Sequence, residues 1–173
     1  RHRLLEWPDD NNIRPTKDRI RESIFNALGD ISNLTFLDLY SGSGAFGIEA
    51  VSRGCKKSYF VDINPIALKT IRNNINNLKI PMESAYVFAM SDVSAINTLS
   101  SKEEKVDILF MDPPYKHGQY NEIINFAFNA NILNDNAIII TESDHYLEFD
   151  NDMFSKRKDY KYGEIFVTIL WRK

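Results

Sequence analysis

A glycine-rich turn directly after an apolar segment constrains the fold of this chain more than any other feature. Residues 35–40 are typical of a buried strand, and the chain continues at once into Ser41-Gly42-Ser43-Gly44-Ala45-Phe46-Gly47. Glycine, which has no Cβ, lets a backbone turn tightly and lie close to a ligand. A helix is expected from Ala45 to Arg53. The turn therefore joins a strand to a helix at the edge where α/β sheets bind their ligands.

A second strand, Lys57–Val61, ends on Asp62, and the next helix begins at Asn64 and Pro65. This is a βαβ unit in which Asp62 lies twenty residues after Gly42. Such an acid, combined with the glycine spacing of the turn, is the dinucleotide-binding fingerprint. The acid can accept hydrogen bonds from the ribose hydroxyls of adenosine, which NAD and S-adenosylmethionine share. At this stage a nicotinamide enzyme and a methyltransferase are both candidates.

Strands and helices continue to alternate along the chain. Apolar periodicity predicts helices at 17–28 (capped by Thr16), 93–99 and 119–130, strands at 85–89, 106–111 and 137–141, and a hairpin over 156–162 and 164–171 turning at Gly163. The prediction is α/β: a single domain over residues 1–173 with a Rossmann-like fold of the class I S-adenosylmethionine-dependent methyltransferases. Its seven-stranded sheet is expected to be mostly parallel, with a C-terminal antiparallel β-hairpin that plain dinucleotide folds usually lack.

The fourth strand, Val106–Met111, leads into the segment that carries the chemistry, Asp112-Pro113-Pro114-Tyr115. The two prolines fix φ and hold this loop stiff and extended. The Asp112 carboxylate and the Pro113 carbonyl can accept hydrogen bonds from an exocyclic amine, and Tyr115 can stack on the base that carries it. We therefore interpret Asp112, Pro113, Pro114 and Tyr115 as the catalytic loop. The simpler interpretation is a turn that only ends the strand.

Two further acids favour S-adenosylmethionine over a nicotinamide cofactor. Asp38 lies four residues before Gly42, where it would repel a pyrophosphate but could help to position a cationic methionine moiety. Asp92 follows the third strand, where it could accept from the adenine amino group or cap the next helix. The second half of the chain offers no evident site for hydride transfer. The expected cofactor-binding residues are Asp38, Ser41, Gly42, Gly44, Asp62 and Asp92.

Three arginines, Arg14, Arg19 and Arg21, lie near the start of the first expected helix. The helix dipole disfavours cations at this end. One explanation is that they bind an anionic ligand, either RNA phosphate or the carboxylate of the cofactor, and they are the candidate substrate-binding residues. The alternative is that they pair with Asp18 and Glu22.

Charge and cysteine content limit the partners and the compartment. The net charge of −3 argues against a protein that coats nucleic acid generally. Lys and Arg nevertheless outnumber the acids in residues 1–21 and 156–173, which allows a local phosphate-binding face. Cys55 is the single cysteine, so a reducing cytoplasm is the expected setting. No apolar run approaches the ~20 residues needed to cross a bilayer, so no membrane partner is expected.

Three blocks of the chain together resemble the bacterial 16S ribosomal RNA guanine-N2 methyltransferase D family. They are Arg14-Pro15-Thr16-Lys17-Asp18-Arg19-Ile20-Arg21-Glu22, Phe36-Leu37-Asp38-Leu39-Tyr40-Ser41-Gly42-Ser43-Gly44 and Asp112-Pro113-Pro114-Tyr115. The similarity covers nearly the whole chain, and its first block is the specific signal, because many amino-methyltransferases share the other two. The resemblance implies S-adenosylmethionine as donor and a guanine exocyclic amine in 16S rRNA as acceptor, within the assembled or assembling 30S subunit.

The family normally begins with a Gly- and Arg-rich strand, of which only Arg1-His2-Arg3-Leu4 is similar here. Residues 1–13 are therefore expected to be a remnant of an N-terminal RNA-binding arm. A sulfonium already activates its methyl group, so no metal is expected, and the protein is expected to be a monomer. Two alternatives stay open: an adenine-N6 methyltransferase acting on DNA or RNA, and a cofactor-binding ribosome-assembly factor.

Overall fold

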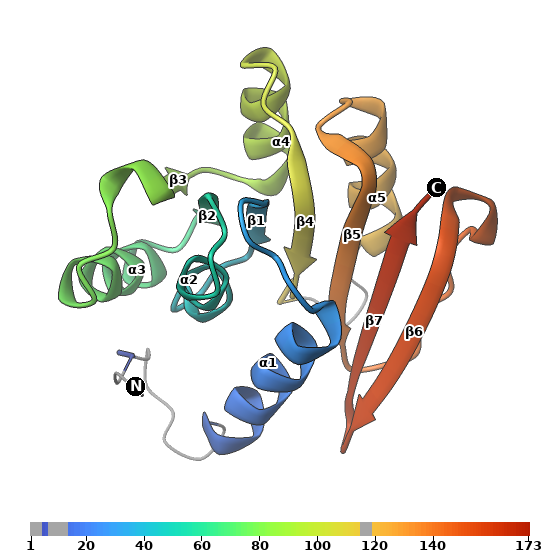
Figure 1. The fold of residues 1–173 in the computed structure, drawn as a ribbon, viewed down its shortest axis with the longest axis horizontal. Coiled ribbons are helices and arrows are strands. Elements are labelled where there is room, and N and C mark those ends of the chain that lie inside the picture. Colours follow the sequence, from blue (N-terminus) through green and yellow to red (C-terminus); the bar gives the residue numbers. More distant parts are fainter. Residues whose placement is uncertain (1–4, 7–13, 115–118) are drawn as a thin grey trace.

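The computed structural model describes residues 5–6, 14–114 and 119–173, and in them a seven-stranded sheet lies between two layers of helices (Figure 1). The elements in chain order are α1 (Arg14–Leu28), β1 (Thr35–Leu39), α2 (Ala45–Ser52), β2 (Lys57–Asp62), α3 (Pro65–Asn77), η1 (Met82–Ser84), β3 (Ala85–Ala89), α4 (Asp92–Ser101), β4 (Val106–Met111), α5 (Tyr120–Asn129), β5 (Leu133–Ser143), η2 (Asn151–Met153), β6 (Phe154–Tyr162) and β7 (Ile165–Arg172).

The strand order is β3-β2-β1-β4-β5-β7-β6. The first five strands of the chain are parallel, whereas β7 pairs antiparallel with both β5 and β6. This confirms the expected class I methyltransferase fold, including the closing hairpin. The chain winds outward in opposite directions from β1 and β4, so a crevice opens beyond the carboxyl ends of these two strands.

Strand alternation divides the core into two layers. Leu37 and Leu109 point toward the layer of α4 and α5, whereas Phe36 and Phe110 point toward α1. Because side chains two apart share a face, the acid two residues after Phe36 must lie on the α1 side of the sheet. That acid is Asp38, and its register partner on β4 is Phe110. The pattern that buries the core therefore also directs this carboxylate.

Three local expectations differ from the structure. Helix α1 begins at Arg14, so Thr16 lies inside the helix and its predicted capping role is wrong. Proline is compatible with the first turn because its missing N–H has no partner there. Helix α4 is capped by Ser91, whose hydroxyl accepts from the amide of Ser94 at 3.2 Å, so the capping role predicted for Asp92 is wrong.

Strand β5 is also longer than predicted, because both of its ends are held by neighbouring strands. Leu133 pairs with Val106, and the segment from Ile138 to Ser143 pairs with β7. Polar residues at 134–136 hide the strand from a search based on apolar runs, because pairing of backbone amides does not require apolar side chains.

Two predictions fall on residues outside the described ranges. One is the stacking role of Tyr115. The other is the arm remnant over residues 1–13, of which only Leu5 and Glu6 are described. The Glu6 amide donates to Asn74 Oδ1 at 2.8 Å, so this short piece of chain lies against α3. Among the described residues no helix is long and apolar enough to span a membrane.

Candidate active site

The glycine turn is held firmly on one side and open on the other. The Ser41 amide donates to the Val61 carbonyl at 3.0 Å, and the Ser41 hydroxyl accepts from the Val61 amide at 2.9 Å. These bonds fasten the end of β1 to β2. Gly42 and Gly44 have positive φ values of 57° and 80°, which side chains with a Cβ rarely adopt. A Cβ added to Gly42 would meet no atom within 4 Å, so the backbone here is open to a ligand.

The third glycine of the fingerprint has a different role. A Cβ on Gly47 would lie 2.4 Å from Cε1 of Phe60, a fully buried ring on β2. Gly47 therefore allows α2 to pack closely against the sheet, and its amide also donates to Asp38 Oδ2 at 3.1 Å. The sequence pattern did not distinguish this packing role from ligand contact.

Substituting Gly47→Ala is expected to destabilise the fold by about 1–3 kcal/mol, because neither the ring nor the helix can move without loss of packing. Chemical denaturation followed by circular dichroism measures this difference. Ser52→Ala, an exposed change in the same helix, serves as the control and should leave the unfolding free energy unchanged. Equal stability of Gly47→Ala and the wild type would show that α2 does not depend on this close contact.

Asp62 stands at the end of β2 and organises the backbone around the cleft. Its Oδ2 accepts from the Gly42 amide and its Oδ1 accepts from the Asn64 amide, both at 2.9 Å. The Asn64 side chain in turn caps α3 by accepting from the Ile66 amide at 2.9 Å. Asp62 thus joins the glycine turn to the start of the next helix, a role additional to the ribose contact expected from the sequence.

A large open cleft of about 1400 Å³ brings several of the predicted residues together. Asp62 and Asp92 line one part of it, and Asp112 lines another. The exposed side chain of Ile63 adds an apolar wall beside the two acids. Carboxylates that can accept from hydroxyl and amino groups, next to an apolar surface, fit an adenosine. The donor set and the open backbone at Gly42 are therefore compatible with S-adenosylmethionine.

Tyr40 is a site residue that sequence reasoning missed. It follows β1 with a positive φ of 60°, a costly conformation for an aromatic residue. Its hydroxyl donates to Asp92 Oδ2, and both residues line the cleft. Asp92 Oδ1 also accepts from the Val93 amide at 2.7 Å. The strained turn thus links the residue beside the glycine turn to the residue that begins α4, and the available signal was the place of Tyr40 in the second resemblance block.

Asp38 is almost completely buried, with 1% of its surface exposed. Burial raises its pKa to about 8, with smaller contributions from the charges of Asp62 and Asp112, while the bond from the Gly47 amide acts in the opposite direction. Burial therefore favours the neutral form of this carboxyl. Its predicted contact to a cationic ligand requires the ligand itself to favour the ionised form.

A second, smaller cavity of about 100 Å³ lies on the α1 side of the sheet and shares Gly42 and Asp112 with the large cleft. Lys17 of α1 and Glu142 at the end of β5 line it, and the sequence analysis assigned a role to neither. Burial raises the pKa of Asp112, and the Lys17 charge lowers it. Burial also raises the pKa of Glu142 to about 7. Residue 17 stood in the first resemblance block, but nothing in the sequence linked it to residue 142.

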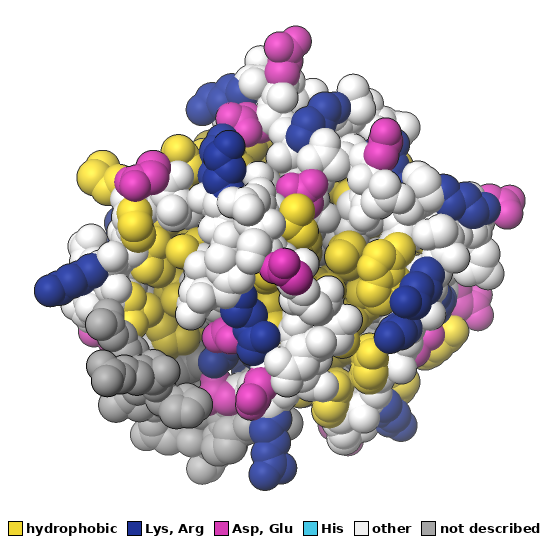
Figure 2. All heavy atoms as spheres, viewed as in Figure 1, with side chains coloured by type: hydrophobic (Ala, Val, Ile, Leu, Met, Phe, Trp, Pro, Cys, Tyr) yellow, Lys and Arg dark blue, Asp and Glu magenta, His cyan; other side chains and the backbone are white. Residues whose placement is uncertain are grey.

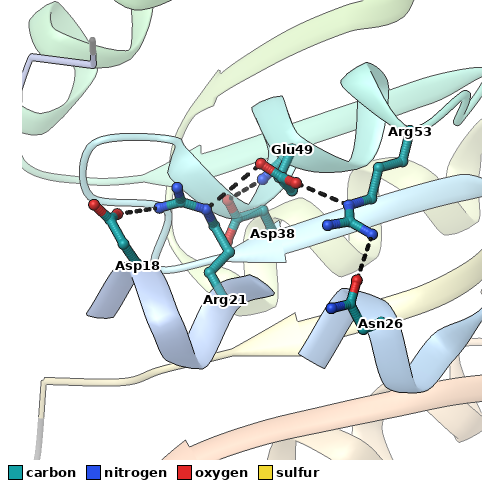
Figure 3. Close-up of polar contacts among 7 residues, drawn as sticks. Asp18, Arg21, Asn26, Asp38, Glu49 and Arg53 are labelled. Atoms are coloured by element: carbon teal, nitrogen blue, oxygen red, sulfur yellow. Dashed lines mark hydrogen bonds and ion pairs between the residues drawn. The ribbon is translucent and has the colours of Figure 1, made fainter. Parts of the chain in front are cut away.

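Of the three candidate arginines of α1, Arg21 has its charged partners in view (Figure 3). Arg21 Nη1 donates to Asp18 at 2.9 Å, and its Nε lies 3.7 Å from a carboxylate oxygen of Glu49. The pairing alternative therefore holds for Arg21, although Glu49 rather than Glu22 is the second partner. Arg19 is exposed, and the side chain of Arg14 lies outside the described part of the structure.

The basic C-terminal segment is divided by strand alternation. Lys156 lies over the Trp171 ring at 4.7 Å, on the same face as α1. Arg157 points the other way, donates to Asp159 and the Leu147 carbonyl, and lies over aromatic rings. In Figure 2 hydrophobic side chains gather beside α1, over the β7–β6 part of the sheet, with Lys and Arg at their margin. A phosphate-binding face here therefore contains fewer cations than the sequence suggests.

Two remaining groups have ordinary structural surroundings. Cys55 is buried, its Sγ lies 3.5 Å from the Ile31 carbonyl, and burial raises the pKa of its thiol to about 12. A thiol of this kind is a core side chain rather than a nucleophile. Within residues 5–6, 14–114 and 119–173, no group of three or more His, Cys, Asp or Glu is arranged to hold a metal ion.

Comparison with known proteins identifies the family. The family model described as Conserved hypothetical protein 95 matches residues 1–171. Ribosomal RNA small subunit methyltransferase D of Escherichia coli strain K12 is 34% identical over 145 residues, which cover 83% of this chain and 71% of that protein. The chain belongs to the ribosomal RNA small subunit methyltransferase D family. The resemblance carried by the three sequence blocks is thereby confirmed.

Solved structures agree with this assignment to the methyltransferase D family. The Escherichia coli protein yhhF is 29% identical, with a TM-score of 0.85 over 100% of this chain and 93% of that chain. SMU.776, a more distant methyltransferase fold solved in complex with SAH, is 15% identical with a TM-score of 0.70 over 90% of this chain and 49% of that chain. Family and fold together confirm the expected class, an S-adenosylmethionine-dependent methyltransferase.

Proposed function

We propose that this protein transfers a methyl group from S-adenosylmethionine to the exocyclic N2 amine of a guanine in 16S rRNA of the small ribosomal subunit. The observation that carries the proposal is the placement of Asp112 in the cleft that Asp62 and Asp92 also line. One end of this cleft suits an adenosine, and the other presents a carboxylate and a stiff loop to an amine. Family membership supports RNA as the acceptor, because the Escherichia coli relative is named as a ribosomal RNA methyltransferase.

The two ends of the cleft have separate roles in this proposal. Asp62 and Asp92 accept from hydroxyl and amino groups of the adenosine, while the open backbone at Gly42 lies against the methionine part. When bound, S-adenosylmethionine supplies a methyl group on a sulfonium, and the carbon–sulfur electron pair stays on the sulfur as the methyl is transferred. Everything else required of the protein is positioning.

Positioning matters because the lone pair of a guanine amine is delocalised into the ring. Hydrogen bonds from this amine to the Asp112 carboxylate and the Pro113 carbonyl favour a pyramidal nitrogen whose lone pair points at the methyl group. The Asp112 carboxylate can then take the proton that the amine loses. Holding two reactants in such a geometry can lower a barrier by roughly 7–11 kcal/mol.

The target base has to leave its stack, because a paired base cannot reach the cleft. Tyr115, which lies beyond the described residues, is proposed from the sequence to stack on the flipped base, a contact worth roughly 1–3 kcal/mol. Lys156 and Lys158 are exposed on the α1 side and could contact RNA phosphate. With few such cations and a net charge of −3, the protein should bind naked RNA weakly.

The test is methylation of 30S particles purified from cells that lack the gene for this chain. Label from S-adenosylmethionine is followed through nuclease digestion and chromatography of the nucleosides, and it should appear in N2-methylguanosine. Free 16S rRNA and duplex DNA serve as comparison substrates and should accept little label. Label in N6-methyladenosine would favour the adenine alternative. Binding of SAH and of 30S particles without any transfer would favour an assembly factor.

A further inference from the structure

The carboxyl ends of three adjacent strands each carry an acid on the side of the sheet that α1 covers. In register, Asp38 on β1 lies beside Phe110 on β4, which lies beside Ile140 on β5. Two residues further along β4 and β5, on the same face, the chain places Asp112 and Glu142. The sheet thus sets these two carboxylates side by side at the acceptor end of the cleft.

Glu142 is unusual because its carboxyl group is buried close to a second acid, Asp112. Its surface is 7% exposed. The backbone is held in place, since the Tyr120 hydroxyl donates to the Glu142 carbonyl at 2.8 Å. The side chain lines the small cavity together with Lys17 and Asp112. A carboxyl group that is buried beside another acid costs stability, so its presence beside the proposed acceptor site requires an explanation.

The groups around this cavity have a pattern that matches one nucleobase. Two neighbouring acceptors, Asp112 and Glu142, line it together with two cationic donors of α1, Lys17 and Arg21, and the buried Asp38 lies on the β1 side. Guanine presents two neighbouring donors, N2–H₂ and N1–H, followed by the O6 acceptor. Adenine presents an amine followed by the N1 acceptor, which a carboxylate at residue 142 would repel. Two neighbouring carboxyl groups therefore suit the base edge that carries two donors.

We propose that Glu142 and Lys17 are specificity residues that read the N1–H and O6 positions of the target guanine while Asp112 holds its N2 amine. This inference rests on the proposed function and adds the basis of its choice of base. Lys17 and Glu142 had no role assigned from the sequence. It also gives a role to the Lys17 charge, which lowers the pKa of both Asp112 and Glu142.

The ionisation of Glu142 should be visible in the pH dependence of methyl transfer. Among the described residues, the charged groups that line the same cavity as Glu142 are Asp112 just after β4, Lys17 and Arg21 on α1 and Asp38 on β1, and Tyr120 on α5 also interacts with it. Burial, followed by the Asp112 charge, raises the pKa of Glu142 from 4.5 to about 7, and Lys17 acts against both. Only the ionised carboxylate accepts the N1 proton donor. Methyl transfer should therefore rise with pH through about 7.

The experiment compares Glu142→Gln with wild type and with Glu164→Gln, the same chemical change at an exposed position of the β6–β7 turn. Single-turnover methylation of 30S particles lacking the modification should fall by about 10- to 150-fold in Glu142→Gln, the range for a lost hydrogen bond to a charged group. The Kd for SAH, measured by calorimetry, should stay within about twofold. Glu164→Gln should match the wild type in both measurements.

Two further readouts separate recognition from a merely structural role. The rise in rate near pH 7 should move to lower pH in Glu142→Gln, because Asp112 loses a neighbouring negative charge. In Glu142→Asp, which keeps a carboxylate, the rise in rate should stay near pH 7. A particle reconstituted with adenosine at the position that the wild type labels should be a poor substrate for wild type. Glu142→Gln should methylate it better relative to guanosine, because an amide can donate to adenine N1.

The thermal stability of Glu142→Gln serves as the folding control. The direction of its expected change follows from the raised pKa of Glu142. Between pH 4.5 and about 7 the folded protein binds more protons at Glu142 than the unfolded chain, so stability contributed by this group is lost as pH rises. The thermal midpoint of Glu142→Gln at pH 8 should therefore equal or exceed that of the wild type. A variant that is both inactive and less stable would contradict the inference.

The possible failures are distinguishable. If the wild type places no label in N2-methylguanosine, the proposed function itself is wrong. If the wild type does so and Glu142→Gln retains its rate and its base preference, only the specificity role is wrong. If Glu142→Gln weakens SAH binding tenfold or more, the cavity belongs to the methionine end of the cofactor site, and the inference is overturned.

Discussion

Asp112→Ala is expected to remove nearly all methyl transfer while leaving the affinity for S-adenosylmethionine close to that of the wild type. The carboxylate stands where the acceptor amine is proposed to lie, and the residues assigned to the adenosine lie elsewhere in the cleft. Loss of one preorganised hydrogen-bonding group in an active site lowers turnover on the order of 10²–10³-fold. Folding should be preserved, because the variant removes a buried acid from beside Glu142 and Asp38.

Single-turnover rates on 30S particles measure the loss of methyl transfer, and calorimetric titration with SAH measures the affinity for the cofactor. Asp135→Ala is the matched control, since the Asp135 side chain is 93% exposed near the opposite end of β5. That variant should behave as wild type in both assays. Near-normal turnover by Asp112→Ala on the natural particle would mean that the loop does not hold the acceptor.

The second large effect is expected for cofactor binding. Asp62→Ala should weaken binding of SAH by roughly 10- to 150-fold, the equivalent of losing a hydrogen bond to a charged group worth about 1.5–3 kcal/mol. The structure adds a reason beyond the ribose contact. The same carboxylate holds the amides of Gly42 and Asn64, so its removal also loosens the glycine turn. Asp62→Asn retains one acceptor oxygen and should lose less affinity.

Calorimetry with SAH measures this loss, and Asp152→Ala, an exposed change in η2, is the control. Parallel titrations with NAD test the competing cofactor that the glycine fingerprint alone allowed. Tight binding of NAD without any response to S-adenosylmethionine or SAH would contradict both the cofactor and the proposed reaction. An unchanged Kd in Asp62→Ala would instead remove only this residue from the site.

Much of the fold was predictable because its signals are local. Apolar runs, helix caps and glycines act over a few residues, and they indicated the parallel strands, their helices and the closing hairpin. The end of a strand also has a known position in a parallel sheet. Asp62, Asp92 and Asp112, separated by fifty residues of chain, could therefore be expected at one edge, and the structure places all three in one cleft.

Other features depend on which side chains the tertiary structure brings together. Arg21 and Lys17 lie one helical turn apart in the same basic block and line the same cavity, yet Arg21 pairs with Asp18 and Glu49 while the Lys17 charge acts on Asp112 and Glu142. No pattern along the chain links Lys17 to Glu142. Their proximity follows from the packing of α1 across β5, which is separated from it by more than a hundred residues.

The sequence by itself determined the order and type of the elements, the family, and the edge of the sheet that carries the site. Tertiary structure alone decided which charges are buried, which are paired, and which face the cavities. The physical reason is that strand period and turn chemistry are properties of neighbouring residues. The pKa of Asp38 or Glu142, in contrast, depends mainly on the water excluded by distant segments.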